Sequence, residues 1–283
     1  REKFTWEKIS REYEKIFLHR LILNNKSTNF REPEKIVNKV FLLLFHHTTM
    51  RTILETTEDG SHTLYVPELE EHYHSTHGAI QESMHVFIDA GLRHCNNEHI
   101  HLLEIGFGTG LNGLLTLLEA EKLHKKLFYH SLERFPLTET IAMQLNYPEQ
   151  ITMGSATPPL QDEKRLTLLF HQLHLSPWER ATAITPSFTL LKEEGDFSHP
   201  EQFQPSRQYE LIYFDAFAPE KQPEMWQDKI FRRLYALSSD NGILTTYCAK
   251  GAVRRMLQSV GFTVERLPGP PGKREMLRAT KVK

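Results

Sequence analysis

Cysteine is scarce in this 283-residue chain, which has only Cys95 and Cys248, far apart in the sequence. Two such residues exclude the disulfide framework of a small secreted protein and are typical of the reducing cytoplasm. The longest uninterrupted apolar run, 40–45, is far shorter than the ~20 residues that a membrane span needs. Secretory signals, internal repeats and low-complexity tracts are also missing. We therefore expect a cytoplasmic globular protein with no membrane association and no obligate protein partner.

A strong overall charge is missing too, because 34 basic residues stand against 36 acidic ones. The chain as a whole is therefore not a polycation, yet residues 249–283 hold nine basic and only two acidic side chains. Such a region has the charge needed to dock on a phosphate backbone, and a solvated helix face with a basic terminus has the same composition. Charged residues are 25% and hydrophobic residues 39% of the chain, which favours a folded enzyme over a disordered protein.

The most informative stretch is an apolar run over 99–105 that is followed by three alternating glycines, Gly106, Gly108 and Gly110. A helical pattern from Leu111 to Ala120 comes directly after them. A strand, a glycine turn and a helix start form the cradle in which a parallel sheet holds a nucleotide-type ligand. Glycine allows close approach of the ligand to the backbone, and the first turn of the helix offers free N–H groups.

The rest of the chain alternates between strand-like and helix-like segments, which predicts a mostly parallel, Rossmann-like α/β sheet. Further strands are expected at 127–132, 188–191, 210–214 and 243–247, and helices at 136–145, 164–174, 225–237 and 252–260. The last two strands, 262–267 and 275–280, have no helix between them, so we expect the sheet to end in an antiparallel hairpin. Asp59-Gly60 and Asn241-Gly242 predict turns, and Gly261 a helix end. We assign this domain to residues 50–283 and treat 1–49 as a helical N-terminal extension of unknown role.

Four acids, Glu104, Glu133, Asp196 and Asp215, stand at or just after predicted strand ends. Because a doubly wound sheet binds its ligand beyond the carboxyl ends of its strands, we expect these acids on one rim. Glu133 stands at the spacing, ~20 residues beyond the turn, at which an acid holds ribose hydroxyls.

The acid directly before the glycine turn helps to choose the ligand. A pyrophosphate prefers a neutral or positive cradle, whereas S-adenosylmethionine carries a sulfonium and an ammonium but no phosphate, and nearby acids favour those cations. Together with the antiparallel ending, this favours a methyltransferase over a dinucleotide oxidoreductase of the NAD type, which stays the alternative.

Asp215 lies in the segment Phe214-Asp215-Ala216-Phe217-Ala218-Pro219 at the end of a predicted strand. Methyl transfer to an amine is an in-line displacement that needs a neutral amine with its lone pair free. A carboxylate can accept a hydrogen bond from that amine and then take the released proton. We therefore predict a catalytic role for Asp215; the alternative is a carboxylate that caps a turn.

The sequence resembles the methyltransferase domain of the MnmC family, which completes 5-methylaminomethyl-2-thiouridine at the wobble position of tRNA. The resemblance covers most of residues 51–280 and rests on several separate blocks in the right order. They are Glu104-Ile-Gly-Phe-Gly-Thr-Gly-Leu-Asn112, Glu133-Arg-Phe-Pro-Leu-Thr138, Gly195-Asp196, Phe214 to Trp226, Val253-Arg-Arg255 and Gly272-Lys-Arg-Glu-Met-Leu277.

The resemblance implies a class I methyltransferase that moves a methyl group from S-adenosylmethionine to the amine of 5-aminomethyl-(2-thio)uridine in tRNA. The implied cofactor residues are Glu104, Gly106, Gly108, Gly110 and Asn112 on the methionine and sulfonium side, Glu133 at the ribose, and Asp196 with Phe197 at the adenine. Asp215 would lie beside the reacting amine. Family members are often fused to a flavin-dependent oxidase, and because this chain ends at Lys283 we expect no flavin.

On the substrate side, the resemblance places Tyr73, His77 and Glu82 in the wall that faces the uridine. We expect Phe217 to stack on a flipped base, Trp226 and Cys248 to be buried, and Lys273 and Arg274 to contact tRNA phosphates from an exposed loop. His72, His74 and His77 suggest a metal site, but no further ligand completes one, so we expect no metal. A non-catalytic RNA-binding relative and a methyltransferase for another amine remain alternatives.

Overall fold

The computed structural model describes residues 50–154 and 162–283, so the predicted helical extension 1–49 lies outside the described residues. Its centre is an eight-stranded sheet in the order β10-β11-β9-β8-β4-β5-β7-β6. The strands are β4 His99–Ile105, β5 Lys126–Glu133, β6 Thr182–Thr185, β7 Phe188–Glu194, β8 Tyr209–Phe214, β9 Ser238–Thr246, β10 Thr263–Pro268 and β11 Glu275–Thr280. The five strands β9, β8, β4, β5 and β7 are parallel to one another. β11 pairs antiparallel with β9 and with the edge strand β10, and the other edge strand, β6, pairs antiparallel with β7. The predicted α/β sheet and its closing hairpin are confirmed.

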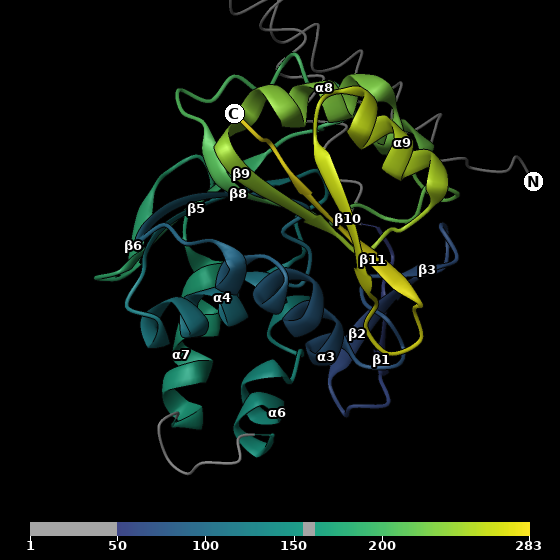
Figure 1. Ribbon diagram of the computed structural model, residues 1–283. Coiled ribbons are helices and arrows are strands. Elements are labelled where there is room, and N and C mark those ends of the chain that lie inside the picture. Colours follow the sequence, from purple (N-terminus) through teal and green to yellow (C-terminus); the bar gives the residue numbers. More distant parts are fainter. Residues whose placement is uncertain (1–49, 155–161) are drawn as a thin grey trace, which may run out of the picture. The chain divides into compact units, whose positions relative to one another are not determined.

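Helices cover both faces of the sheet (Figure 1). α4 Leu111–Lys122 and α7 Glu163–Leu175 pack on one face, and α8 Asp228–Leu237 and α9 Gly251–Ser259 on the other. Each face has its own apolar cluster, one around Leu114, Tyr129 and Phe170 and one around Phe214 and Phe231. Because both faces are covered, the central strands β4 and β8 are buried along most of their length.

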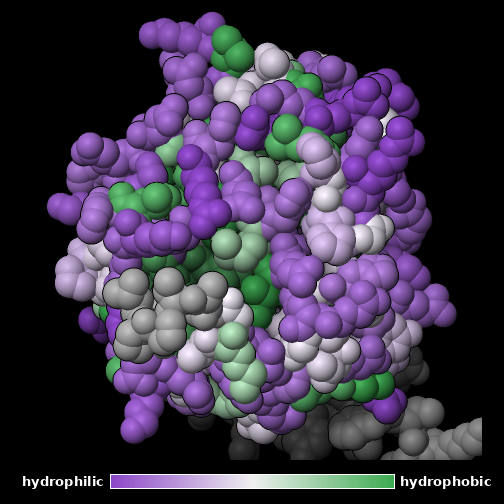
Figure 2. Space-filling view, turned by 60° about the horizontal axis from the view of Figure 1, so that its bottom comes forward, coloured by the Kyte–Doolittle hydropathy of each residue, from purple (hydrophilic) through white to green (hydrophobic). Residues whose placement is uncertain are grey.

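A separate three-stranded sheet precedes the central one: β1 Ile53–Thr56, β2 His62–Val66 and β3 Glu71–His72. Its β1–β2 hairpin turns at the predicted Asp59-Gly60, where Gly60 has a φ of 82°. The chain continues through α3 Ala79–Ser83, a π-helical turn over Met84–Asp89 and a short 3₁₀ turn over Leu92–His94. The surface that Figure 2 turns toward the reader is mostly hydrophilic, and apolar side chains show in a hollow near its middle.

Several predicted boundaries were wrong for local reasons. The helix expected over 136–145 is only one turn, α5 Glu139–Ala142, and a second helix, α6 Tyr147–Met153, begins beyond Asn146, whose amide is bonded to the β1–β2 turn. The helix expected over 225–237 is divided by Gln227 into a 3₁₀ turn, Pro223–Trp226, and α8. The Asn241-Gly242 turn lies inside β9, where the pairing with β8 shifts register. Gly261, at a φ of 115°, does end α9 as predicted.

Among the described residues, no helix combines the length and apolar character that crossing a membrane requires. The described residues also contain both cysteines, which are buried and unpaired.

Candidate active site

A cavity of about 350 Å³ opens at the carboxyl ends of β4, β5 and β8. Its wall includes most of the side chains predicted for the site: Tyr73, Glu82, Gly106, Gly108, Asn112, Glu133, Asp196, Phe197, Asp215, Phe217 and Lys273. The strand-end rule therefore brought residues from segments far apart in the sequence to one cavity, and their roles toward a ligand stay predictions.

The glycine turn between β4 and α4 has a backbone that only glycine adopts easily. Gly106, Gly108 and Gly110 have φ angles of 96°, 49° and 73°. A Cβ on Gly106 would lie 2.7 Å from the Asp215 carbonyl oxygen, and one on Gly110 would lie 2.7 Å from His174 Nε2. The turn is thus packed between the end of β8 on one side and α7 on the other. Of the three, Gly106 and Gly108 line the cavity, while Gly110 supports them from behind.

Two residues after β3 brace this turn, and sequence reasoning missed one of them. His74 is buried, and its Nε2 lies 2.6 Å from Thr109 Oγ1 within the turn. Burial lowers the pKa of His74 to about 4, so the ring is neutral at pH 7. The Tyr73 ring lies against Gly108 and meets Phe217 edge-on, with ring centroids 5.2 Å apart. The segment predicted to face the substrate therefore also shapes the glycine turn.

Asp215 lies directly after β8, half-buried in the cavity wall. Its Oδ2 accepts a hydrogen bond of 2.9 Å from Asn112 Nδ2, and its backbone N–H donates to the Ile105 carbonyl at 3.1 Å. Loss of water around the carboxyl and, to a smaller extent, the charge of Glu82 raise the pKa of Asp215 to about 7, against the opposing effects of the Asn112 hydrogen bond and the Lys273 charge. A carboxyl poised near neutral pH in a cavity is what a proton acceptor requires.

Glu104 does not line the cavity, which corrects the expectation that it contacts the ligand directly. It is fully buried at the end of β4, where Ser131 Oγ donates to its Oε2 at 2.8 Å. Burial raises the pKa of Glu104 well above its ordinary value, and the Asp215 charge adds to the shift. The protonated form is thereby favoured, so the electrostatic argument built on a charged Glu104 before the turn is weaker than the sequence suggested.

Glu133 lies at the end of β5 with both carboxylate oxygens bonded to backbone. Gly108 N–H donates to Oε2 at 2.9 Å and Phe135 N–H donates to Oε1 at 2.6 Å. This carboxylate therefore holds the glycine turn to the next strand end, whichever ligand it also binds. Burial raises the pKa of Glu133, while these hydrogen bonds oppose the shift.

The predicted adenine acid, Asp196, lies beyond β7 at the other end of the cavity. It accepts a 2.8 Å hydrogen bond from Ser198 N–H, and Arg134 Nη1 lies 3.3 Å from its Oδ2. Arg134 also lies 3.5 Å from Glu224 Oε1, and sequence reasoning missed this arginine although it follows the predicted Glu133. Phe197 is buried beside Asp196 and forms part of the wall.

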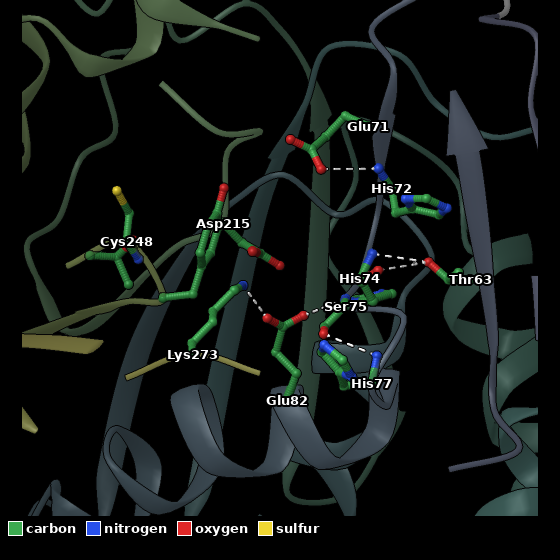
Figure 3. Close-up of polar contacts among 12 residues, drawn as sticks. Thr63, Glu71, His72, His74, Ser75, His77, Glu82, Asp215, Cys248 and Lys273 are labelled. Carbon is green, nitrogen blue, oxygen red and sulfur yellow. Dashed lines mark hydrogen bonds and ion pairs between the residues drawn. The ribbon is translucent and has the colours of Figure 1, made fainter. Parts of the chain in front are cut away.

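Lys273 is placed differently from the exposed loop residue that the sequence predicted, because it is partly buried and lines the cavity. From the loop between β10 and β11 it reaches inward and pairs with Glu82, a buried residue of α3 (Figure 3). Its Nζ also lies 4.0 Å from the centroid of the Tyr247 ring. Tyr247, at the end of β9, was missed, although the strand-end rule that selected the acids also selects this position.

Two other predicted substrate residues lie outside the cavity wall. His77 is exposed, with Nδ1 3.0 Å from Glu58 Oε1, and it packs against Gly272 of the β10–β11 loop. Arg274 is exposed on that loop, as expected for a phosphate contact.

The neighbouring histidines have separate partners, His72 with Glu55 and His74 with Thr109. Within 50–154 and 162–283, no group of three or more His, Cys, Asp or Glu side chains is arranged to hold a metal ion.

The basic C-terminal region is less available than its composition suggests. Lys250, Arg266, Lys273 and Arg278 each pair with an acid, namely Glu220, Glu275, Glu82 and Glu265. Lys281 donates to the backbone carbonyls of Tyr235 and Ser238. Much of the local positive charge is therefore used within the fold, because residues distant in sequence supply the acids.

Phe217 and Trp226 have the locations that the sequence predicted, one in the cavity and one in the core. Phe217 lines the cavity, and Trp226 is buried, its Nε1 donating to the Phe217 carbonyl at 2.7 Å. Cys248 is a small buried side chain, also as predicted.

The cavity fits S-adenosylmethionine on its own chemistry. Asn112, which lines the cavity, has a buried acceptor, Oδ1, with no hydrogen-bond partner among the described residues. Buried acceptors without partners are costly, and an ammonium group is the kind of ligand that satisfies them. The glycine turn brings backbone N–H groups close to the cavity, and the acid-rich wall suits a cationic ligand better than a pyrophosphate.

Comparison with known proteins leads to the same chemistry. Residues 197–282 match the family described as S-adenosyl-L-methionine-dependent methyltransferase. Over 225 residues, 76% of this chain and 32% of the relative, the chain is 33% identical to the tRNA 5-methylaminomethyl-2-thiouridine biosynthesis bifunctional protein MnmC of Magnetococcus marinus. The protein of the same name from Actinobacillus pleuropneumoniae is 29% identical over 238 residues, covering 77% of this chain and 34% of that protein. The chain therefore spans about a third of the length of these curated relatives.

The fold has a solved counterpart in the crystal structure of MNMC2 from Aquifex aeolicus. The two superpose with a TM-score of 0.66 and 22% identity, over 96% of this chain and 85% of that one. This similarity supports the α/β fold with its mainly parallel sheet.

Proposed function

Because this chain belongs to the S-adenosyl-L-methionine-dependent methyltransferases, we propose that it methylates the primary amine of 5-aminomethyl-(2-thio)uridine at the wobble position of tRNA. The product is 5-methylaminomethyl-(2-thio)uridine. The names of its MnmC relatives support this substrate, as do the exposed Arg274 and the aromatic Phe217 in the cavity wall. A cytoplasmic location follows from a tRNA substrate and agrees with two unpaired cysteines.

One observation carries the proposal: the predicted proton acceptor and the glycine turn share a wall. Asp215 N–H donates to Ile105 just before the turn, and the Asp215 carbonyl packs on Gly106. Asn112, the second residue of α4, binds the Asp215 carboxylate. A cofactor seated on the turn and an amine held by Asp215 are therefore neighbours, as an in-line transfer requires.

When bound, S-adenosylmethionine supplies a methyl group on a positively charged sulfur. Asn112 and the turn from Gly106 to Gly108 would hold its amino-acid half, Glu133 the ribose, and Asp196 with Phe197 the adenine.

Asp215 would accept a hydrogen bond from the acceptor amine and so direct the nitrogen lone pair toward the methyl carbon. The nitrogen–carbon bond would form as the sulfur–carbon bond breaks, and the sulfur would keep the bonding pair. The nitrogen then carries a positive charge, and Asp215 takes one of its protons. Asn112 keeps the Asp215 carboxylate oriented throughout, because its amide donates to one oxygen and leaves the other free.

The decisive experiment uses tRNA from cells that cannot add the final methyl group. The protein is incubated with that tRNA and S-adenosylmethionine, and the nucleosides are analysed by mass. We expect aminomethyluridine to gain one methyl group. If the nucleoside mass stays unchanged while the protein binds S-adenosylmethionine, the acceptor assignment is wrong; if the protein binds NAD instead, the whole proposal is wrong.

A further inference from the structure

The cavity wall carries more acids than bases, and this excess disfavours the neutral amine that methyl transfer needs. Five acids line it, against two basic residues: Glu71, Glu82, Glu133, Asp196 and Asp215 against Arg134 and Lys273. An excess of carboxylates raises the pKa of a bound amine because it stabilises the ammonium form. An ammonium has no lone pair, so a purely acidic cavity would bind the acceptor in a form that cannot attack the methyl group.

The two basic residues lie at different ends of the cavity. Arg134 is paired with Asp196 and Glu224 at the predicted adenine end. Lys273 is at the other end, where its charge acts on Asp215 and lowers the pKa of that carboxyl. Among the described lining residues, Lys273 is therefore the cation placed to act on an acceptor held by Asp215 (Figure 3).

Several contacts hold Lys273 in this place although it comes from a loop. Its ammonium donates to Glu82 Oε1, and Glu82 Oε2 accepts a 2.8 Å hydrogen bond from Ser75 N–H. The Tyr247 ring makes a cation–π contact with the Lys273 ammonium, whose Nζ lies 4.0 Å from the ring centroid. The loop itself is fastened, since His85 Nε2 lies 2.7 Å from the Pro268 carbonyl oxygen.

An ammonium has three N–H donors, and Glu82 and the Tyr247 face account for two of those on Lys273. Within the described part of the chain, no other hydrogen bond involves its Nζ. The side chain is 33% exposed and lines the cavity. Its remaining donor and its positive charge are therefore available to whatever occupies the acceptor end.

We propose that the Lys273–Glu82 pair sets the protonation state of the acceptor amine, with Lys273 as a positioning residue that makes the neutral amine the favoured form in the cavity. The proton of the free ammonium stays in the solvent when the neutral amine enters. Glu82 holds Lys273 in place. The negative charge of Glu82 also limits the effect of Lys273 on the acceptor, because it favours the ammonium form of the acceptor amine. This inference rests on the proposed function, since it assumes an amine acceptor.

Other titratable groups face the same space and belong in any pH analysis. They are Asp215 after β8, Glu133 at the end of β5, Glu71 and His72 in β3, Tyr73 and His74 after β3, and Tyr247 after β9. The charges of Glu82 and Lys273 act on Asp215 in the same direction as on an amine beside it: Glu82 favours the protonated form and Lys273 opposes it. The two members of the ion pair therefore have opposite effects on the pH dependence, although removing either one breaks the same contact.

The test compares Lys273→Met and Glu82→Gln in the full chain, with Lys273→Arg as the control that keeps the charge. Methyl transfer to an anticodon stem-loop RNA carrying 5-aminomethyluridine is measured from about pH 6 to pH 9.5. We expect Lys273→Met to move the rising limb of kcat, which reports the enzyme–substrate complex, upward by about one pH unit, a roughly tenfold loss of kcat at neutral pH that disappears in base. Glu82→Gln should move the limb downward, and Lys273→Arg should leave it in place.

Two further readouts separate this role from a structural one. In Lys273→Met the acceptor is still bound, as the ammonium, so kcat should fall without a rise in KM. With S-adenosylhomocysteine bound, wild-type protein at neutral pH should prefer RNA with 5-hydroxymethyluridine over the amine, and Lys273→Met should shift that preference toward the amine by about tenfold. Affinity for S-adenosylmethionine and the melting temperature report whether each variant is folded.

The inference is overturned if both broken-pair variants lose activity by the same factor at every pH, or if Lys273→Arg is as impaired as Lys273→Met. A failure of the proposed function looks different, because then the wild-type protein itself methylates no aminomethyluridine RNA.

Discussion

The proposed cofactor end of the cavity, at the glycine turn, and its proposed acceptor end, at Glu82 and Lys273, are built in different ways. At the cofactor end, the glycine turn, Asn112, Glu133 and Asp215 follow neighbouring strands of one sheet and are joined mostly by hydrogen bonds to backbone. At the acceptor end, Glu82 and Lys273 come from segments separated by most of the domain and meet through side chains alone. The first end is fixed by the sheet, whereas the second depends on the packing of two loops and a short helix.

The two ends also differ in how they treat charge. Glu104 is buried among hydrogen-bonding groups under the cofactor end, where burial favours its neutral form. Glu82, equally buried, keeps a cation beside it. The carboxyl under the glycine turn is therefore held by hydrogen bonds and burial, whereas the carboxyl of Glu82 is held by an ion pair.

The largest effect should come from the residue that joins the two ends. Asp215→Asn keeps the shape of the side chain but removes the proton acceptor, so kcat should fall by about 10²-fold or more. Calorimetry should show little change in affinity for S-adenosylmethionine. Asp228→Asn, an exposed acid of α8 outside the cavity, is the matched control and should retain full activity. Equal activity of the two variants would remove Asp215 from the mechanism.

The same residue sets a pH dependence. Because the pKa of Asp215 is raised to about 7, the ionised acceptor forms as pH rises through 7, and single-turnover rates should rise with it. Stability moves the other way: the folded state holds this proton more tightly than the unfolded state, so the contribution of Asp215 to the unfolding free energy falls between pH 3.8 and about 7. Asp215→Asn should flatten both curves, as rapid-quench assays and denaturant titrations at several pH values would show.

A second, smaller effect tests the rigidity of the cofactor end. Gly106→Ala forces a side chain into a positive φ and against the Asp215 carbonyl, at a cost of about 1–3 kcal/mol. We expect a lower melting temperature and at least a tenfold weaker affinity for S-adenosylmethionine. Gly154→Ala is the matched control, since its φ is −76° and a Cβ there comes no closer than 3.4 Å to the Gln150 carbonyl oxygen. If both variants bind alike, the turn is more adaptable than its geometry indicates.

The brace under the glycine turn should appear as an acid sensitivity. His74 is held neutral with a pKa of about 4, so between that value and its ordinary 6.5 the unfolded state binds the proton and the folded state does not. The unfolding free energy should therefore fall as pH drops from 6.5 to about 4, by up to about 3 kcal/mol from this residue. His74→Gln should remove that part of the slope in denaturant titrations, and His99→Gln, an exposed change, should not.

The smallest effect concerns the rim near the acceptor end. Arg274 is exposed on the loop that carries Lys273, so Arg274→Ala should weaken tRNA affinity a few-fold and lower the salt dependence of binding by about one phosphate contact. Arg266→Ala is the comparison, because Arg266 is already paired with Glu275. Binding titrations at several salt concentrations would measure both, and identical slopes would exclude a phosphate contact at Arg274.

Local sequence determined the cofactor end of this protein. The glycine turn needs positive φ angles, and the strand ends of a parallel sheet share one edge. Both properties depend on short consecutive segments of the sequence. Residue type and position were therefore enough to predict that Gly106, Glu133, Asp196 and Asp215 lie together, and all four line the cavity. The same holds for the alternating elements and the closing hairpin, since hydrophobic period and glycine placement are local.

Tertiary structure alone decided which charges are paired and which are buried. Lys273 has the sequence context of an exposed loop residue and becomes part of the cavity because α3 brings Glu82 to meet it. Glu104 has the context of a rim acid and lies beneath the rim because Asn112 and Asp215 cover it. Pairing and burial depend on distances between segments far apart in the chain, and no local pattern encodes those distances.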